Sequence, residues 1–346
     1  MNWKNLKGNP DLWEVLRRRE KVVDAVRAFF KKQRFLEVFT PSMVSSLIPE
    51  SYLEVFETEL KDKEGNSKKM FLTPSPEIWH KKLITAGSGN IFEITKSFRN
   101  TDCGGRFHHP EFTILEWYRT NCDYRQVMED CENLIRYLLT ALQRIVHINK
   151  YSKKLILKCQ GKSIDISRPF ARMTVAEAFE KYTGVKKDEL FDLEKIRKKI
   201  RDKGYEISDK DDWETIFTLL YVGEIEPNLG WERPTIIYDY PSQFSPLSKT
   251  SEKDERIKER FELYIGGVEI ADGCTELTDA AEQKKEFSKE IKKRKILGKS
   301  KFPVDWDFVS ALKSGLPPCA GVALGIDRLL MVLLGKEDIR EVIMES

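Results

Sequence analysis

The sequence lacks the features that mark a disulfide-stabilised, zinc-binding or membrane protein. Its six cysteines stand singly, with no CxxC pair, so we expect reduced thiols. The most apolar run near the C-terminus, residues 329–335, is far shorter than the ~20 residues of a membrane-spanning helix. The charged start MNWKNLKGNP does not read as a secretory leader, and we expect a cytoplasmic protein without a membrane span.

A surplus of charge of one sign is missing as well. Fifty-nine Lys and Arg residues against fifty-six Asp and Glu residues leave a formal charge of +3 over 346 residues. A dedicated nucleic-acid coat would be strongly basic, so an RNA partner is neither required nor excluded. With 40% hydrophobic and 33% charged residues, the composition is that of a globular protein.

The common nucleotide and metal motifs are also absent. LGKS at 297–300 ends like a phosphate-binding loop, but position 293 is lysine where that motif needs glycine, and there is no GxGxxG. Cys103, His108 and His109 lie close in the sequence without a fourth spaced ligand, so we reject a zinc site. A nucleotide or metal site must therefore use other residues.

The hydrophobic pattern predicts an α+β protein, an antiparallel β-sheet flanked by helices. Strands that come in hairpins, rather than alternating with crossover helices, favour antiparallel pairing. We expect Arg17, Arg18 and Arg19 to lie on the solvated side of the first long helix. Residues from about 150 to 235 look like a mixed insertion within a single domain of residues 1–346. Helices are expected at 11–34, 123–146 and 279–297, antiparallel strands at 89–99 and 111–119, strands again after 235, and a strand-turn-helix at 319–334.

One strand combines aromatic side chains with a carboxylate. In EFTILEWY the strand period of two places Phe112, Ile114, Glu116 and Tyr118 on one face. For an isolated strand, the alternative is a half-exposed sheet with a solvated glutamate.

A second segment, ERFELYIGGVEIADGCTEL, predicts a hairpin. A two-residue loop at Gly266 and Gly267 pairs Tyr264 with Glu269, which places Glu262 on the same face as Glu269. Two carboxylates roughly 7 Å apart repel each other, and a magnesium ion bound to substrate phosphates would relieve this repulsion. The alternative is an exposed hairpin with basic neighbours.

The third segment, GVALGIDRLLMVLL, places Arg328 in the first turn of an apolar helix. A cation there opposes the helix dipole unless it meets an anion, and a phosphate would supply one. The alternative is an ion pair with the adjacent Asp327.

Together and in this order, these segments resemble motif 2, the metal-binding carboxylate region and motif 3 of class II aminoacyl-tRNA synthetases, with FLEVFTPSM at 35–43 as motif 1. SPE at 75–77, HHPEFTILEWY, YPSQFSPLS at 240–248 and GGVEIADGCTEL are most similar to the lysyl branch. The resemblance covers most of residues 10–346 and implies the class II catalytic core.

The resemblance implies roles for matching positions. Arg99 would hold the α-phosphate and the activated carboxylate, and Arg328 the γ-phosphate, as the catalytic pair. Glu262 and Glu269 would bind Mg²⁺, in agreement with the hairpin argument. The ATP site would comprise these arginines, Glu269, Phe112 stacked on adenine, Asn100, Thr101, Asp102, His109, Ile270 and Gly325. Glu77, Glu116, Tyr118 and Glu276 would surround the substrate's amino groups, beside Ser75, Pro76 and Ala323.

Only about forty residues precede motif 1, so we expect no N-terminal oligonucleotide-binding (OB) barrel that reads an anticodon. This architecture resembles the elongation factor P (R)-β-lysine ligase family, which activates (R)-β-lysine with ATP and transfers it to a lysine side chain of that factor. Ala323 agrees, because the tRNA-charging enzymes resemble one another in having glycine there. The implied ligands and partners are ATP, Mg²⁺, lysine or β-lysine, elongation factor P and a second copy of the chain.

Some positions depart from the family pattern. Thr101 and Asp102 stand where the family has a single glutamate, His109 and Asp272 replace asparagines, and Cys274 replaces an aromatic residue. Two alternatives stay open. One is a small synthetase paralogue that charges a tRNA or another small acceptor. The other is a synthetase-like module without catalysis, against which the two arginines and two glutamates argue.

Overall fold

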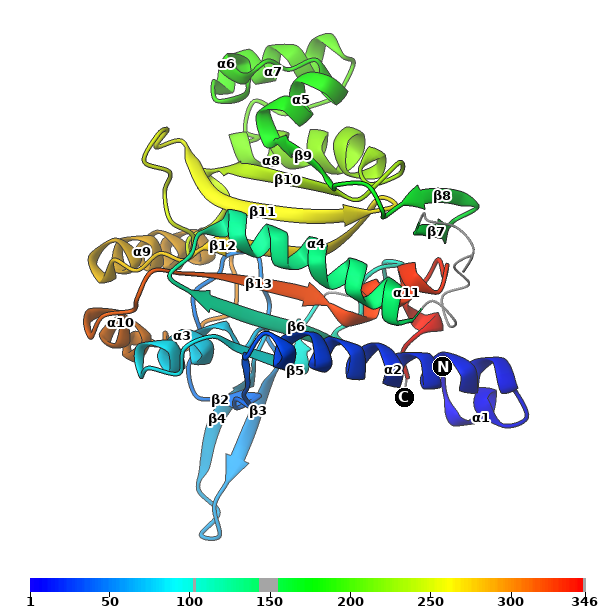
Figure 1. Cartoon of the computed structure of the whole chain (residues 1–346). Coiled ribbons are helices and arrows are strands. Elements are labelled where there is room, and N and C mark those ends of the chain that lie inside the picture. The colour runs from blue at the N-terminus through cyan, green and yellow to red at the C-terminus, as the bar shows by residue number, and fades with distance from the viewer. Residues whose placement is uncertain (102–103, 143–154, 345–346) are drawn as a thin grey trace.

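The computed structural model describes residues 1–101, 104–142 and 155–344, built around an eight-stranded sheet (Figure 1). The six central strands pair antiparallel, and this confirms the expected α+β architecture. The two outermost pairs are parallel, so the antiparallel prediction is wrong at both edges. The strand order is β1 (Leu36–Glu37), β5 (Ile91–Phe98), β6 (Glu111–Thr120), β13 (Cys319–Gly325), β12 (Val268–Thr275), β11 (Ile257–Ile265), β10 (Thr235–Pro241) and β9 (Ala171–Thr174).

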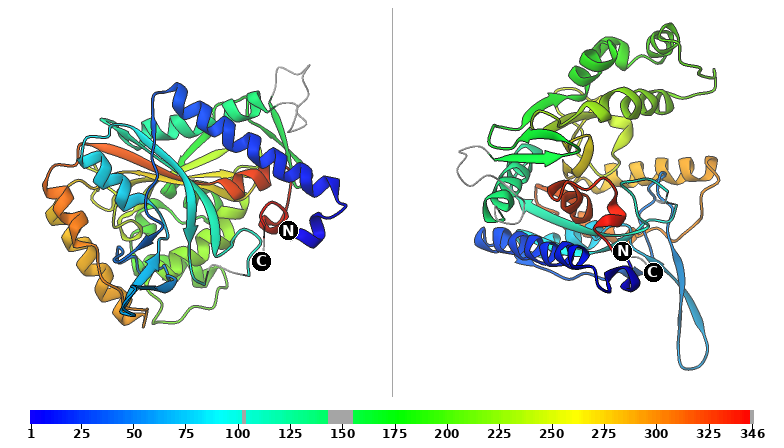
Figure 2. Two further views of the ribbon diagram at one scale, coloured as in Figure 1. Left: turned by 90° about the horizontal axis from the view of Figure 1, so that it is seen from below. Right: turned by 90° about the vertical axis from the view of Figure 1, so that its right-hand side faces the viewer.

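Three helices cover one face of this sheet: α2 (Pro10–Lys32), α4 (Tyr124–Ala141) and α11 (Ile326–Leu333) (Figures 1 and 2). Asn9 caps α2, which has proline at its first position, where no donor is lost. Phe30 of α2 stacks on Phe92 and packs against Trp117, all fully buried. The odd-numbered side chains of β6 thus enter the core, and the opposite face is left for a site.

The expected solvated face of α2 is wrong for Arg19. Its guanidinium donates to Asp327 of α11 at 2.5 Å and to the Thr113 hydroxyl at 2.6 Å. The backbone N–H of Thr113 also donates to Asp327, at 2.6 Å. These charge-assisted hydrogen bonds link α2, β6 and α11.

The hairpin of β11 and β12 confirms the expected loop. Gly266 and Gly267 have φ of 62° and 74°, which glycine adopts without strain, and Tyr264 pairs with Glu269. A register shift between Leu263 and Tyr264 then pairs Glu262 with Asp272. A regular antiparallel register continued from the Tyr264–Glu269 pair would place Glu262 opposite Ala271. The structure does not have this register, because the bulge adds a residue to one strand.

The middle section, described from residue 155, joins the main core with residues 155–170. Its later part packs on the β10 edge around a second hydrophobic cluster. It contains an antiparallel hairpin at 156–165 and a helix capping box of Thr174 and Glu177. The division into a core and an insertion stays a prediction. The elements are β7 (Ile156–Cys159), β8 (Lys162–Asp165), α5 (Val175–Thr183), α6 (Lys187–Leu190), α7 (Leu193–Asp202), α8 (Trp213–Leu220), the π-helix η1 (Tyr221–Ile225) and η2 (Glu226–Asn228).

The remaining elements surround the open face. A small sheet projects from the body as a long β3–β4 hairpin (Figure 2). Within the described residues, no helix combines the length and apolarity needed to cross a membrane. The elements are α1 (Trp3–Leu6), β2 (Met43–Val44), β3 (Glu57–Lys61), β4 (Ser67–Leu72), α3 (Glu77–Thr85), η3 (Ser242–Phe244), α9 (Ala280–Ile296), α10 (Trp306–Lys313) and η4 (Ile339–Glu341).

Candidate active site

A cavity of about 380 Å³ lies on the sheet face away from α2 and α4. It collects most of the residues that the sequence singled out. Four others, Pro76, Asn100, Thr101 and Glu262, do not line it, and Asp102 lies outside the described residues. The predicted residues that line it are Ser75, Glu77, Arg99, His109, Phe112, Glu116, Tyr118, Glu269, Ile270, Glu276, Ala323, Gly325 and Arg328.

Arg99 gives the cavity a cation that lacks a full set of partners. Its guanidinium lies 5.2 Å from the centre of the Phe112 ring. In the described part of the chain, its Nε is buried and has no hydrogen-bond partner. Because a buried charged donor without an acceptor is costly, this atom indicates a place for an anionic ligand.

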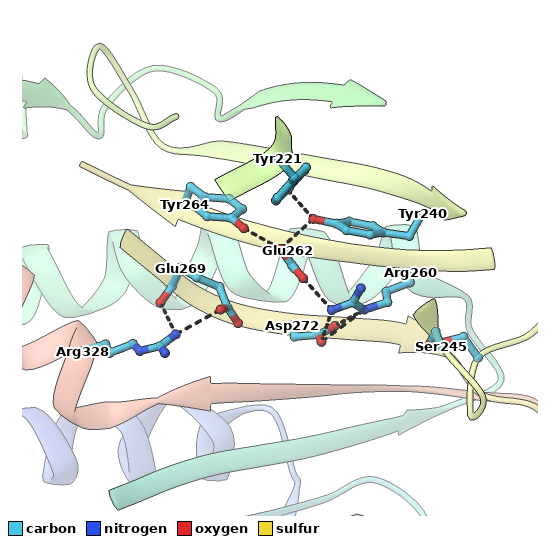
Figure 3. Close-up of polar contacts among 10 residues, drawn as sticks. Tyr221, Tyr240, Ser245, Arg260, Glu262, Tyr264, Glu269, Asp272 and Arg328 are labelled. Atoms are coloured by element: carbon cyan, nitrogen blue, oxygen red, sulfur yellow. Dashed lines mark hydrogen bonds and ion pairs between the residues drawn. The ribbon is translucent and has the colours of Figure 1, made fainter. Parts of the chain in front are cut away.

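Arg328 provides a second cation in the same cavity. Its guanidinium donates to the Glu269 carboxylate at 3.1 Å (Figure 3). It also donates to the carbonyl of Phe107 at 3.0 Å. The alternative pair with Asp327 is wrong, because Asp327 accepts instead from Arg19 and Thr113. In the structure Arg328 thus pairs with the carboxylate of Glu269, and a bound phosphate would have to displace it.

Glu262 lies behind the cavity wall in a dense hydrogen-bond network (Figure 3). Its carboxylate accepts from the hydroxyls of Tyr240 at 2.6 Å and Tyr264 at 2.5 Å, and from Arg260 at 2.5 Å. Tyr221 of the π-helix contacts the hydroxyl of Tyr240 at 2.5 Å. Three side chains therefore fix the orientation of one carboxylate, and Tyr221 supports it through Tyr240.

The pKa values of the carboxylates in this region indicate whether it could bind a divalent cation. Burial raises the pKa of Glu262 to about 7, with Glu269 acting in the same direction although Arg260 opposes both. Burial, Glu269 and Glu262 likewise raise the pKa of Glu226 to about 7. Neighbouring carboxylates repel one another when both are ionised, and a hard cation that prefers oxygen ligands would relieve this repulsion. No three described His, Cys, Asp or Glu side chains could hold a metal alone, so phosphate oxygens and water would have to complete the shell.

Arg260 is a functional candidate that the sequence reasoning missed. It forms a bidentate pair with Asp272, with its shortest distance at 2.7 Å, and also contacts Glu262. Arg260 stands two residues before Glu262, so the strand period of two could have found it. It compensates two carboxylates that would otherwise repel each other.

Lys81 was also missed, and it lies among the carboxylates expected to bind the substrate. Its ammonium contacts Glu77 at 2.6 Å and Glu276 at 2.5 Å, and its side chain is 0% exposed. Burial opposes its charge, but Glu276 and Glu77 raise the pKa of Lys81. Burial raises the pKa of Glu276 to about 7 although Lys81 opposes it. The i,i+4 spacing of Glu77 and Lys81 was the available signal.

Glu116 stands at the middle of the cavity on β6. Its carboxylate accepts from the Ser75 hydroxyl at 2.6 Å and from the Tyr118 hydroxyl at 3.4 Å. The predicted shared face of Glu116 and Tyr118 is confirmed, since both line the cavity. His80 lies behind Glu116, and nothing in the sequence pattern pointed to it.

Helix α9 holds a loop against the mouth of the cavity. Buried Arg294 donates to the carbonyls of Glu50 at 2.6 Å and Leu53 at 2.7 Å, and Glu290 accepts from the Ser51 N–H at 2.7 Å. Arg294 therefore lies inside the protein rather than on a solvated face of this basic helix. Burial and nearby Glu77 raise the pKa of Glu50, which lines the cavity, to about 7.

Comparison with known proteins gives relatives over nearly the whole chain. A family model described as tRNA synthetases class II (D, K and N) matches residues 2–344. A Vibrio parahaemolyticus serotype O3:K6 (strain RIMD 2210633) protein named elongation factor P--(R)-beta-lysine ligase is 35% identical over 336 residues, 95% of this chain and 94% of that protein. Proteins of the same name from Avibacterium paragallinarum and Proteus mirabilis (strain HI4320) are each 36% identical over 332 residues, covering 95% of this chain and 94% and 93% of theirs.

These findings confirm the family inferred from the motifs and the expectation of a ligase with a class II synthetase core. The coverage is nearly complete on both sides of each alignment, so the likeness is not confined to the motifs. The chain belongs to the class II tRNA synthetases and, within them, to the family of elongation factor P (R)-β-lysine ligases.

Proposed function

We propose that the protein activates (R)-β-lysine with ATP and transfers it to a lysine side chain of elongation factor P. One observation carries the proposal: a single cavity joins the cations Arg99 and Arg328 to the carboxylates Glu77, Glu116 and Glu276. Anionic phosphates suit the first group, and a substrate's ammonium groups suit the second, because buried charges need compensation. The names of the relatives support the choice of substrate and acceptor.

The first step would be adenylation. The substrate carboxylate attacks the α-phosphorus of ATP, a new P–O bond forms, and the bond to the bridging oxygen of the β-phosphate breaks to release pyrophosphate. Arg99, with its unpartnered Nε, would stabilise the charge that develops on the α-phosphate. Arg328 would bind the γ-phosphate after leaving Glu269, and Phe112, beside Arg99, would stack on adenine.

The second step would be aminolysis. The acceptor's lysine amine attacks the carbonyl carbon of the mixed anhydride, an amide forms, the amine loses a proton and AMP leaves. No covalent intermediate on the protein is needed, so catalysis would consist of positioning and charge stabilisation. His109, Ile270 and Gly325 line the cavity and would complete the ATP site. Asn100, Thr101 and Asp102 stay predictions.

Glu262 and Glu269 would hold Mg²⁺, with Glu226 nearby. Their all-oxygen donor set fits a hard divalent cation, as do the raised pKa values of Glu262 and Glu226. The pKa of Glu269 is lowered, because Arg328 and Arg260 outweigh its burial. When bound with ATP, Mg²⁺ would neutralise phosphate charge. On the protein side, the two tyrosines that donate to Glu262 fix its carboxylate, and opening of the Arg328–Glu269 pair would free the other.

Ala323 supports the β-amino acid. It pairs with Glu116 of β6 on one side and with Asp272 of β12 on the other, so it stands between a candidate ammonium-binding carboxylate and a carboxylate that Arg260 holds. Ser75, Pro76, Glu77, Tyr118 and Glu276 would form the rest of this pocket.

A homodimer is also proposed. Leu36 in the edge strand β1 is 55% exposed, Phe39 just after it is 79% exposed, and Met43 is exposed as well. Exposed apolar side chains at a sheet edge indicate a surface that another chain covers. A cytoplasmic location stays a prediction.

The experiment is a label-transfer assay with ATP, labelled lysine or (R)-β-lysine, and either purified elongation factor P or bulk tRNA. We expect AMP formation and label on elongation factor P with the β-isomer. Label on tRNA would favour the small-synthetase alternative. No adenylate with either isomer, from folded protein, would contradict the proposal as a whole.

A further inference from the structure

A buried histidine lies directly behind the substrate pocket. His80 is 0% exposed on α3, and its Nε2 lies 2.9 Å from a carboxylate oxygen of Glu93 on β5. Its Nδ1 lies 3.6 Å from Glu116 on β6 and has no hydrogen-bond partner among the described residues. One ring nitrogen is therefore satisfied, and the other points at a carboxylate that lines the cavity.

The partners of Glu93 determine which nitrogen carries a proton. Glu93 accepts from the Thr40 N–H at 2.9 Å and from the Thr40 hydroxyl at 2.8 Å. His80 is the third donor to this carboxylate. The three hydrogen bonds stabilise its ionised form, so they outweigh burial and lower the pKa of Glu93. Because an ionised carboxylate only accepts, Nε2 of His80 must be the N–H that donates to it.

The second ring nitrogen then has two possible states. Without a proton, the Nδ1 lone pair faces a Glu116 oxygen inside the protein, which is unfavourable. With a proton, it can donate to Glu116 and the imidazolium balances two carboxylates. Burial would lower the pKa of His80, but Glu116 and Glu93 overcome this effect and raise it.

Other charged groups near His80 come from the same elements and from the residue that follows β12. On α3, the Lys81 ammonium is held by Glu77 and by Glu276, directly after β12. The Tyr118 ring of β6 meets the His80 ring edge-on at 5.3 Å. Lys81 is already shared between two carboxylates, so Glu116 has only His80 beside it as a balancing cation among these groups.

We propose that His80 is a positioning residue for Glu116, doubly protonated while the pocket is empty, which loses its Nδ1 proton when a substrate ammonium binds Glu116. The substrate's ammonium then takes the place of the imidazolium charge. The inference rests on the proposed function, since it assigns Glu116 to a cationic substrate. Substrate affinity therefore rises with pH through the pKa of His80, about tenfold for each unit by which binding lowers that pKa.

The test uses the nitrogen NMR signals of the imidazole rings in the whole protein, which has only four histidines. His80→Gln, which keeps a donor toward Glu93, assigns the His80 signals by their loss. In free protein we expect both His80 nitrogens protonated, with a titration midpoint above the ordinary ~6.5. Saturating lysine or (R)-β-lysine should lower this midpoint. A midpoint at or below ~6.5 in the free protein, or one that the bound amino acid leaves unchanged, overturns the inference.

Calorimetry in buffers of different ionisation enthalpy provides a second measurement. When an amino acid binds, the wild-type protein should release up to about one proton from His80, in addition to any protons that Glu276 and Glu50 release. The His80→Gln variant should lack the proton from His80. An equal proton count in a folded, binding-competent variant contradicts the inference. Absence of any lysine binding to the wild type would refute the proposed function instead, and the free-protein midpoint would still decide the state of His80.

Discussion

Lys81 allows a stringent test of the electrostatics of the cavity. Replacing it with methionine keeps the aliphatic stem but removes the ammonium that contacts Glu77 and Glu276 at 2.6 and 2.5 Å. Removal of one partner from a buried pair typically costs about 3–5 kcal/mol, because the other charge stays buried without compensation. We expect Lys81→Met to lower the free energy of unfolding by about this amount near pH 8.

The loss should be smaller at lower pH. The pKa of Glu276 is raised to about 7 in the folded protein against an ordinary 4.5, so its protonated form favours the native state, and this contribution is lost as pH rises through about 7. Without Lys81 the pKa of Glu276 rises further, and protonation near pH 6 removes the unpaired charge. Urea unfolding followed by tryptophan fluorescence at both pH values measures the difference.

The control is Lys69→Met, which breaks the exposed pair with Glu57. Exposed pairs contribute about 0–1 kcal/mol, so this variant should change stability little and equally at both pH values. A Lys81→Met variant that behaves like this control, or one that loses the same free energy near pH 6 and pH 8, would refute the reasoning.

Three further predictions concern activity and assembly. Glu269→Gln should reduce amino-acid-dependent pyrophosphate exchange about a hundredfold or more, and full exchange by the folded variant would contradict the metal assignment. Light scattering should give about twice the 40.4 kDa chain mass, and Phe39→Asp should shift the protein to monomer; a monomeric wild type at micromolar concentration counts against the dimer. Ala323→Gly should raise kcat/KM for adenylation of lysine relative to (R)-β-lysine by roughly ten- to two-hundredfold, and an unchanged ratio in an enzyme that already prefers lysine would argue for the small-synthetase alternative.

Local periodicity predicted much of the site. The strand period of two was enough to place Glu116 and Tyr118 on the cavity face, and the loop at Gly266 and Gly267 fixed the pairing of Tyr264 with Glu269. Both predictions depend on residues close in the chain, where backbone geometry leaves few options. The bulge between Leu263 and Tyr264 could not be read in the same way, because nothing in these apolar residues departs from strand preference and the shift depends on pairing with β12.

Local sequence patterns could not predict the partners of the charged residues. Arg19 pairs with Asp327 across 308 positions of the sequence, and Lys81 meets Glu276 only because α3 and β12 approach the same cavity. The same applies to His80, whose neighbours lie on β5 and β6. The run of arginines was therefore interpreted as a solvated face, and the alternative considered for Arg328 was an ion pair with the adjacent Asp327 rather than with Glu269.

The pairs found in the structure determine what ligand binding has to change. Glu77 and Glu276 already share Lys81, and Glu269 already holds Arg328. A ligand therefore replaces existing partners, and it gains only the difference between its own contacts and those it displaces. Arg99 is the exception, since its buried Nε has no partner to lose among the described residues. By this reasoning a phosphate at the Nε of Arg99 displaces no hydrogen-bond partner, whereas contacts at the other charged groups mainly select which ligand can restore the balance of charge.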